Sequence, residues 1–243
     1  GDPTRDFTVP LMHQMVASGA NMIELGVPFS DPMADGPTIQ RASERALENN
    51  ISLRDVLSMV HEFRQKDAAT PVILMGYLNP IEVMGYQEFA DAAADAGVDG
   101  VLTVDLPPEE AEGLLDALCP KQIDPILLLA PTSTTDRIKR ISDVASGFIY
   151  YVSMRGTTGG GSLLLDEVRS KVAEIRQQSA LPIGIGFGIR DAESARTLSR
   201  VGDAVVVGSV LVDIIERMAA TPDQIAPEIT RILRSMRAAM DLA

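Results

Sequence analysis

Two carboxylates near the amino terminus are the residues best suited to carry out chemistry. Glu24 lies inside the apolar stretch Asn21–Val27, and Asp35 follows eleven residues later in Ala-Asp-Gly-Pro. A carboxyl group withdrawn from water has a raised pKa, which suits proton transfer near neutral pH. A buried ion pair is the alternative, but no Lys or Arg occurs within sixteen positions after Glu24. We therefore predict an acid–base role for Glu24. For Asp35 a catalytic role and a turn role fit equally well, while Asp31 fits a turn or helix cap.

Two glycine-containing segments near the carboxyl terminus predict a phosphate site. Gly184-Ile-Gly-Phe-Gly-Ile-Arg and Val207-Gly-Ser each follow an apolar stretch and precede a helical pattern. Backbone N–H groups of glycine and of helix N-termini bind phosphate in barrel enzymes. The predicted substrate-binding residues here are Phe187, Gly188, Gly208 and Ser209. Glycines for tight turns, with Ser209 as an N-cap, are the alternative for either segment alone.

A glycine-rich segment follows the apolar stretch Gly147–Val152. Between Gly156 and Ser162 there are four glycines and three hydroxyl residues. Small and flexible residues of this kind are typical of a lid that closes over a substrate. A disordered surface loop has the same composition and remains the alternative.

The rarity of other reactive side chains narrows the chemistry. The only lysines are Lys66, Lys121, Lys139 and Lys171, and none follows directly on an apolar strand pattern, which disfavours a Schiff-base mechanism. His13 and His61 are the only histidines, and no cluster of His, Cys and carboxylate has metal-ligand spacing, so no metal site is predicted. These patterns favour cofactor-free proton transfer on a small phosphorylated substrate.

Composition and charge limit the partners and the compartment. The chain has 243 residues, 46% hydrophobic and 23% charged, and 21 basic against 34 acidic residues give a net charge of −13. Such a surface repels nucleic acid and anionic lipid, so neither nucleic-acid nor membrane binding is predicted. The single cysteine, Cys119, suits a reducing compartment. With no apolar run of membrane-spanning length and no signal-peptide pattern, we predict a cytoplasmic protein.

Short apolar stretches alternate with segments of helical period along the whole chain, which predicts one α/β domain over residues 1–243. The predicted strands are Asn21–Val27, Val72–Gly76, Gly100–Val104, Pro125–Leu129, Gly147–Val152, Pro182–Gly186 and Ala204–Val207. The predicted helices include Phe7–Ser18, Ser52–Gln65, Tyr86–Ala96, Pro108–Leu118, Leu165–Gln178, Ala192–Ser199 and Ser209–Met218.

Seven strands preceded by a helix predict a (β/α)8 TIM barrel whose first strand lies ahead of residue 1. The loops after the strands are rich in residues that could act in a site, as in the mouth of a barrel. An open, doubly wound sheet that starts with a helix is the alternative.

Seven motifs, in this order along essentially the whole chain, resemble the tryptophan synthase α subunit family. They are Glu24-Leu-Gly-Val-Pro-Phe-Ser-Asp-Pro with Ala-Asp35-Gly-Pro-Thr-Ile-Gln, Asp105-Leu-Pro-Pro, Leu129-Ala-Pro-Thr, Tyr150-Tyr-Val-Ser, Gly156-Thr-Thr-Gly, Gly186-Phe-Gly-Ile and Val207-Gly-Ser. The resemblance implies retro-aldol cleavage of indole-3-glycerol phosphate to indole and glyceraldehyde 3-phosphate in an eight-stranded barrel, without a cofactor in this subunit. It also implies a β-subunit partner that carries pyridoxal phosphate, in an α2β2 complex.

The resemblance also implies roles for individual residues. Glu24 matches the family's catalytic acid–base glutamate, and Asp35 matches the aspartate that stabilises positive charge at the indole nitrogen. Tyr150 matches an active-site tyrosine, and Tyr77 matches another near the indole pocket. Further matches are Thr158 and Gly159 on the lid, and Gly188, Gly208 and Ser209 at the phosphate.

Two features depart from the family pattern. The family's amino-terminal helix and first strand have no counterpart in the chain as given, and Gly159–Gly161 is richer in glycine than this lid requires. Two other functions stay open: an isomerase built on another phosphate-binding barrel, and a catalytically silent scaffold that only activates a β-type partner.

Overall fold

A parallel sheet of seven strands forms the centre of the computed structural model, which describes residues 1–152, 161–186 and 188–243. The strands are β1 (Ile23–Gly26), β2 (Val72–Gly76), β3 (Gly100–Thr103), β4 (Asp124–Leu129), β5 (Ile149–Val152), β6 (Ile183–Gly186) and β7 (Ala204–Val206).

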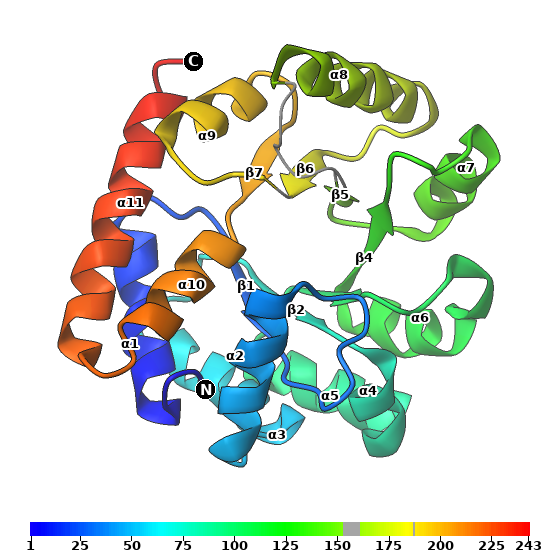
Figure 1. Ribbon diagram of the computed structural model, residues 1–243. Coiled ribbons are helices and arrows are strands. Elements are labelled where there is room, and N and C mark those ends of the chain that lie inside the picture. The colour runs from blue at the N-terminus through cyan, green and yellow to red at the C-terminus, as the bar shows by residue number, and fades with distance from the viewer. Residues whose placement is uncertain (153–160, 187) are drawn as a thin grey trace.

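The strands pair in the order in which they occur in the sequence, from β1 to β7, and every neighbouring pair is parallel. A doubly wound sheet would reverse its strand order near the middle, so that alternative is wrong. The helices form a ring around the curled sheet (Figure 1). The predicted α/β barrel architecture is therefore confirmed, with β1 and β7 as the two edge strands in the described part of the chain.

Most of the ring is α-helical. Its members are α1 (Arg5–Ala17), α2 (Pro37–Glu48), α3 (Leu53–Arg64), α4 (Leu78–Met84), α5 (Tyr86–Ala96), α6 (Glu112–Leu118), α7 (Thr135–Val144), α8 (Gly161–Gln178), α9 (Ala192–Ser199), α10 (Ser209–Arg217) and α11 (Ile225–Met240). Three short 3-10 segments, η1 (Pro108–Glu110), η2 (Cys119–Lys121) and η3 (Pro222–Gln224), lie between them.

Local signals account for several helix ends. Ser52 and Asp55 form a capping box at the start of α3, and Asp191 and Ser194 form another at the start of α9. Helix α5 ends at Gly97, whose φ of +84° is a conformation that favours glycine.

The apolar core has an inner and an outer layer because successive side chains of a strand point to opposite faces. The outer layer packs the strands against the helices, as Leu74 and Val101 do. The inner layer at the centre of the barrel consists of the strand residues Ile73, Leu102, Ile126 and Tyr150, together with Phe148 just ahead of β5. Strands β3 and β6 are buried at every position, as expected for a parallel sheet covered by helices.

Most predicted elements differ from the structure by a few residues at one or both ends, and two of these differences have a clear cause. The segment predicted as one helix from Pro108 to Leu118 divides into η1 and α6. The strand predicted over Asn21–Val27 is shorter, because β1 pairs with β2 only from Ile23 to Gly26 and Pro28 then follows.

Among the described residues, no helix has both the length and the apolar character that crossing a membrane requires.

Candidate active site

Glu24 faces the centre of the barrel from β1. It pairs in register with Ile73 of β2, which belongs to the inner apolar layer, and paired residues of parallel strands point to the same face. Within the described residues, no lysine or arginine forms an ion pair with Glu24. Withdrawal from water raises the pKa of Glu24 from 4.5 to about 7. The group therefore exchanges its proton readily near neutral pH.

Tyr150 shares this interior with Glu24. Its side chain is 8% exposed, and burial, followed by the negative charge of Glu24, raises the pKa of the phenol. Its ring lies 6.4 Å from that of Phe148, between ring centres. The structure thus brings the predicted residues Glu24 and Tyr150 together, with the phenol held in its neutral, hydrogen-bonding form.

Two glycines of β6 make room for these aromatic rings. A Cβ atom at Gly186 would lie 2.4 Å from the hydroxyl oxygen of Tyr150, and one at Gly184 would lie 3.1 Å from the ring of Phe148. Both glycines lie in the strand predicted over Pro182–Gly186, at the start of the predicted phosphate segment, and in the structure they make room for Tyr150 of β5 and for Phe148 just ahead of it. Phe-x-Tyr at the start of β5, followed by Gly-x-Gly in β6, is the sequence signal that could have revealed this role.

Asp35 is held by Tyr77, which follows β2. The Tyr77 hydroxyl donates to Oδ2 of Asp35 over 3.0 Å and accepts from the backbone N–H of Ala34 over 2.9 Å. Tyr77 is 3% exposed and packs against Phe29, with ring centres 5.2 Å apart. Partial burial raises the pKa of Asp35, and the hydrogen bond from Tyr77 opposes that rise. The segment after β1 is therefore anchored to the end of β2.

The rest of that segment consists of turns. Ser30 donates to the exposed Asp31 carboxylate over 2.6 Å, and Gln40 donates to the backbone oxygen of Asp35 over 2.8 Å. The Asp31 carboxylate binds the adjacent Ser30 and does not reach the barrel interior. This agrees with the turn role that the sequence favoured for Asp31. The backbone around Asp35 is held by α2.

The predicted phosphate residues follow adjacent strands. Gly186 of β6 pairs with Val206 of β7, so the segments carrying Gly188 and Gly208 leave the sheet side by side. Gly188 has a φ of +79°, which favours glycine. Gly208 and Ser209 are exposed at the start of α10, whose first amides have no helical carbonyl to bind. This helix start can accept an anion.

Three predicted substrate-binding residues, Thr158, Gly159 and Phe187, lie outside the described residues. The described residues contain no group of three or more His, Cys, Asp or Glu side chains placed to hold a metal ion.

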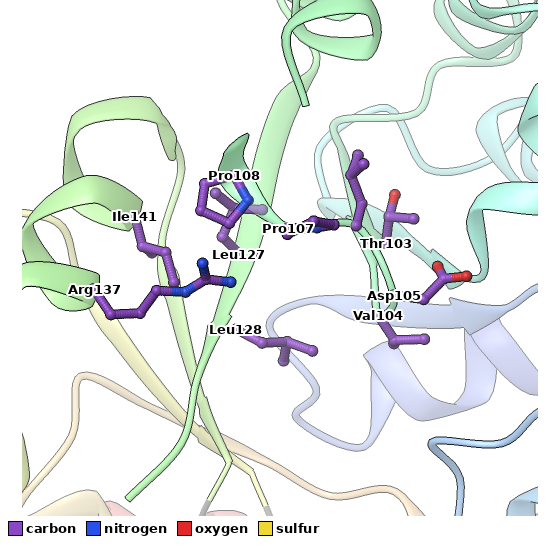
Figure 2. Close-up of a pocket in the computed structure, with 10 residues that line it drawn as sticks. Thr103, Val104, Asp105, Pro107, Pro108, Leu127, Leu128, Arg137 and Ile141 are labelled. Atoms are coloured by element: carbon purple, nitrogen blue, oxygen red, sulfur yellow. The ribbon is translucent and has the colours of Figure 1, made fainter. Parts of the chain in front are cut away.

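A hollow of about 330 Å³ opens between β3 and β4 (Figure 2). The pairing of these strands stops at Leu102 and Ile126, and the hollow begins where the ladder ends. Its lining includes Thr103, Leu127 and Arg137, but none of the predicted site residues that the structure describes. The carboxylates therefore define the candidate site, and the hollow adjoins it through Leu128, which pairs with Tyr150.

Among the candidate residues that the structure describes, Glu24 and Tyr150 project from within strands, and the others follow the carboxyl ends of strands. That rim of a parallel barrel is where enzymes of this architecture bind their substrates. The fold and the desolvated carboxylate of Glu24 define a (β/α) barrel with a site suited to acid–base chemistry.

Comparisons with known proteins specify the family. Residues 1–241 match the family described as Tryptophan synthase alpha chain. The tryptophan synthase alpha chain of Marinobacter nauticus is 59% identical over 241 residues, which cover 99% of this chain and 89% of that protein. The chain belongs to the tryptophan synthase alpha chain family. Its reaction cleaves indole-3-glycerol phosphate to indole and glyceraldehyde 3-phosphate, a cofactor-free lyase step of tryptophan biosynthesis.

Solved structures agree with this assignment. Tryptophan synthase subunit alpha of Legionella pneumophila has a TM-score of 0.93 and 45% identity, covering 100% of this chain and 90% of that one. The tryptophan synthase α2β2 complex of Pyrococcus furiosus has a TM-score of 0.87 and 33% identity, covering 98% and 94%.

Proposed function

We propose that Glu24 is both the acid and the base of the cleavage. It donates a proton to the indole ring carbon that carries the glycerol chain and takes the proton from the neighbouring glycerol hydroxyl. The carbon–carbon bond then breaks, its electron pair returns to the indole ring, and the hydroxyl carbon becomes the aldehyde. The observation that carries this proposal is the isolation of Glu24 in the apolar interior, which raises its pKa to about 7.

Asp35 supplies the second charge in this scheme. Protonation of the indole ring places positive charge on its nitrogen, and a carboxylate next to that nitrogen stabilises it. The hydrogen bond from Tyr77 supports this role because it favours the ionised form of Asp35. Two carboxylates in different environments can thus divide acid–base and electrostatic work.

The remaining site residues bind and enclose the substrate. Phe187, Gly188, Gly208 and Ser209 belong to the phosphate-binding segments, Tyr150 borders the substrate, and Thr158 and Gly159 belong to the closing lid. The exposed start of α10 supports the phosphate role, since helix N-termini favour anions. Tyr77 both anchors Asp35 and borders the indole.

Pairing with a β subunit in an α2β2 assembly completes the proposed enzyme, with pyridoxal phosphate held in the β subunit. The Pyrococcus furiosus relative forms such a complex. None of the four lysines of this chain lies at the carboxyl end of a strand, so the chain offers no evident Schiff-base lysine at the barrel mouth.

A lone exposed thiol, Cys119, supports a cytoplasmic location. The proposed single domain over residues 1–243 is supported by the one sheet that extends from β1 to β7.

The decisive experiment measures indole release from indole-3-glycerol phosphate by the unaltered chain and by Glu24→Gln, each with and without a β subunit. Loss of general acid–base catalysis is expected to slow release by at least about 100-fold. Glu62→Gln, on the exposed side of α3, is the matched control and is expected to leave release unchanged. If Glu24→Gln releases indole as fast as the unaltered chain, the acid–base role is wrong. If no form releases indole but the chain still stimulates a β subunit, the scaffold function replaces it.

A further inference from the structure

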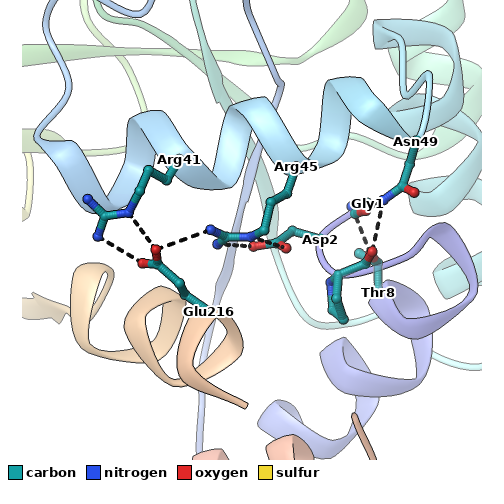
Figure 3. Close-up of polar contacts among 8 residues, drawn as sticks. Gly1, Asp2, Thr8, Arg41, Arg45, Asn49 and Glu216 are labelled. Carbon is teal, nitrogen blue, oxygen red and sulfur yellow. Dashed lines mark hydrogen bonds and ion pairs between the residues drawn. The ribbon is translucent and has the colours of Figure 1, made fainter. Parts of the chain in front are cut away.

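A charged network joins α2, α10 and the residues ahead of α1 (Figure 3). Arg41 of α2 contacts both carboxylate oxygens of Glu216 on α10, at 2.5 Å from Nε to Oε1 and 2.9 Å from Nη2 to Oε2. Arg45, one turn further along α2, lies 3.6 Å from the same Oε1. It also binds both oxygens of Asp2, at 2.9 and 2.8 Å. Two arginines of one helix therefore hold one carboxylate of another.

The two helices start at the two halves of the candidate site. Helix α2 begins at Pro37, two residues after Asp35, and α10 begins at Ser209 of the phosphate-binding segment. A displacement of either helix along its axis therefore moves one half of the site relative to the other.

Each half of the site is built on its own pair of strands. Glu24 and Tyr77 are held relative to each other by the β1–β2 ladder, and Gly188 and Gly208 by the β6–β7 ladder. Helices α2 and α10 pack against each other, and the Glu216 network is the charged part of that contact.

The position of Glu216 is unfavourable for its own helix. It lies in the last turn of α10, where the helix dipole repels a carboxylate. The hydrogen bond from Arg41 offsets this repulsion. It also holds the pKa of Glu216 below its ordinary value. A two-point contact between guanidinium and carboxylate fixes orientation as well as distance. This arrangement serves the contact between the helices rather than the stability of α10.

We propose that Glu216, held by Arg41 and Arg45, is a positioning residue that sets the placement of Asp35 relative to the phosphate-binding start of α10. This inference depends on the proposed roles of Asp35 and Ser209. Glu216 acts through the two helices and does not touch the substrate. Misplacement of reacting groups by about 1 Å can lower a rate by about 100-fold, so a small shift between the helices affects turnover.

Glu216→Gln tests the proposal because the amide keeps the size of the side chain and loses its charge. Glu228→Gln is the matched control, since Glu228 makes a two-point contact with Arg231 inside the single helix α11. In indole-release assays, Glu216→Gln is expected to lower kcat by about 10-fold while the affinity for glycerol phosphate stays unchanged, because Gly208 and Ser209 remain intact. The double variant Arg41→Met/Glu216→Gln is expected to be no slower than the slower single variant.

Hydrogen exchange gives a second measurement that does not require turnover. In the unaltered chain and in Glu228→Gln, glycerol phosphate is expected to slow exchange of the Ile39 and Gln40 amides in the first turn of α2. In Glu216→Gln this slowing is expected to be lost. Retained slowing in Glu216→Gln, or no slowing in the unaltered chain, overturns the proposal. An unaltered chain that shows the slowing but releases no indole refutes the proposed function and leaves the positioning role standing.

Discussion

Replacing Glu24 by glutamine is expected to stabilise the folded chain at alkaline pH as well as abolish the reaction. The pKa of Glu24 rises from 4.5 to about 7 on folding because the carboxylate loses water and gains no cationic partner. A tenfold change in proton affinity corresponds to about 1.4 kcal/mol, so the ionised carboxylate costs the folded state up to about 3 kcal/mol. Because Glu24 is only partly buried by surface area, this figure is an upper limit.

The sign of the effect follows from where the proton is bound. Between pH 4.5 and about 7, the folded chain keeps a proton on Glu24 that the unfolded chain releases. The contribution of this group to stability is therefore fully present below pH 4.5 and is lost as the pH rises through about 7. Glutamine does not titrate. The stability of Glu24→Gln relative to the unaltered chain is thus expected to rise with pH across this window and to level off above it.

Urea unfolding followed by circular dichroism measures the effect at about pH 5, 6, 7 and 8. Glu62→Gln is measured beside it as an exposed control and is expected to show a much smaller pH-dependent difference. A difference in unfolding free energy between Glu24→Gln and the unaltered chain that stays constant over this range would refute the reasoning. The carboxyl would then have an ordinary pKa, and burial would not explain its acid–base role.

Three further substitutions test other parts of the site and core. Tyr77→Phe removes a hydrogen bond that favours ionised Asp35, so the acid limb of the pH profile of kcat/KM is expected to move to higher pH; an unmoved limb contradicts this. Gly186→Ala places a methyl group 2.4 Å from Tyr150, so kcat/KM is expected to fall by at least about 10-fold, and an unchanged value in indole-release assays contradicts the packing. Phe89→Ala empties a site that is 0% exposed and is expected to cost about 3–5 kcal/mol in urea unfolding; a loss below about 1 kcal/mol argues against that burial.

Much of the fold could be predicted from local pattern. The alternation of apolar strands with amphipathic helices depends on neighbours within a few residues, and all seven predicted strands occur in the structure. The helix predicted over Tyr86–Ala96 has the same bounds in the structure, where Gly97 ends it with a positive φ. The division of Pro108–Leu118 was not predicted, because an apolar period does not distinguish one helix from two short ones.

The sequence by itself indicated which residues are candidates to carry the chemistry. A glutamate inside an apolar strand with no nearby basic residue, together with the motif that reaches Asp35, was sufficient for the family and the reaction. Only the tertiary structure decided how these residues are held. Tyr77 reaches Asp35 across 42 positions, and Arg41 reaches Glu216 across 175. The hydrophobic period of a segment depends on residues that are close in the sequence. Contacts between distant segments form only when the sheet curls. The support for the site therefore became visible only in the folded chain.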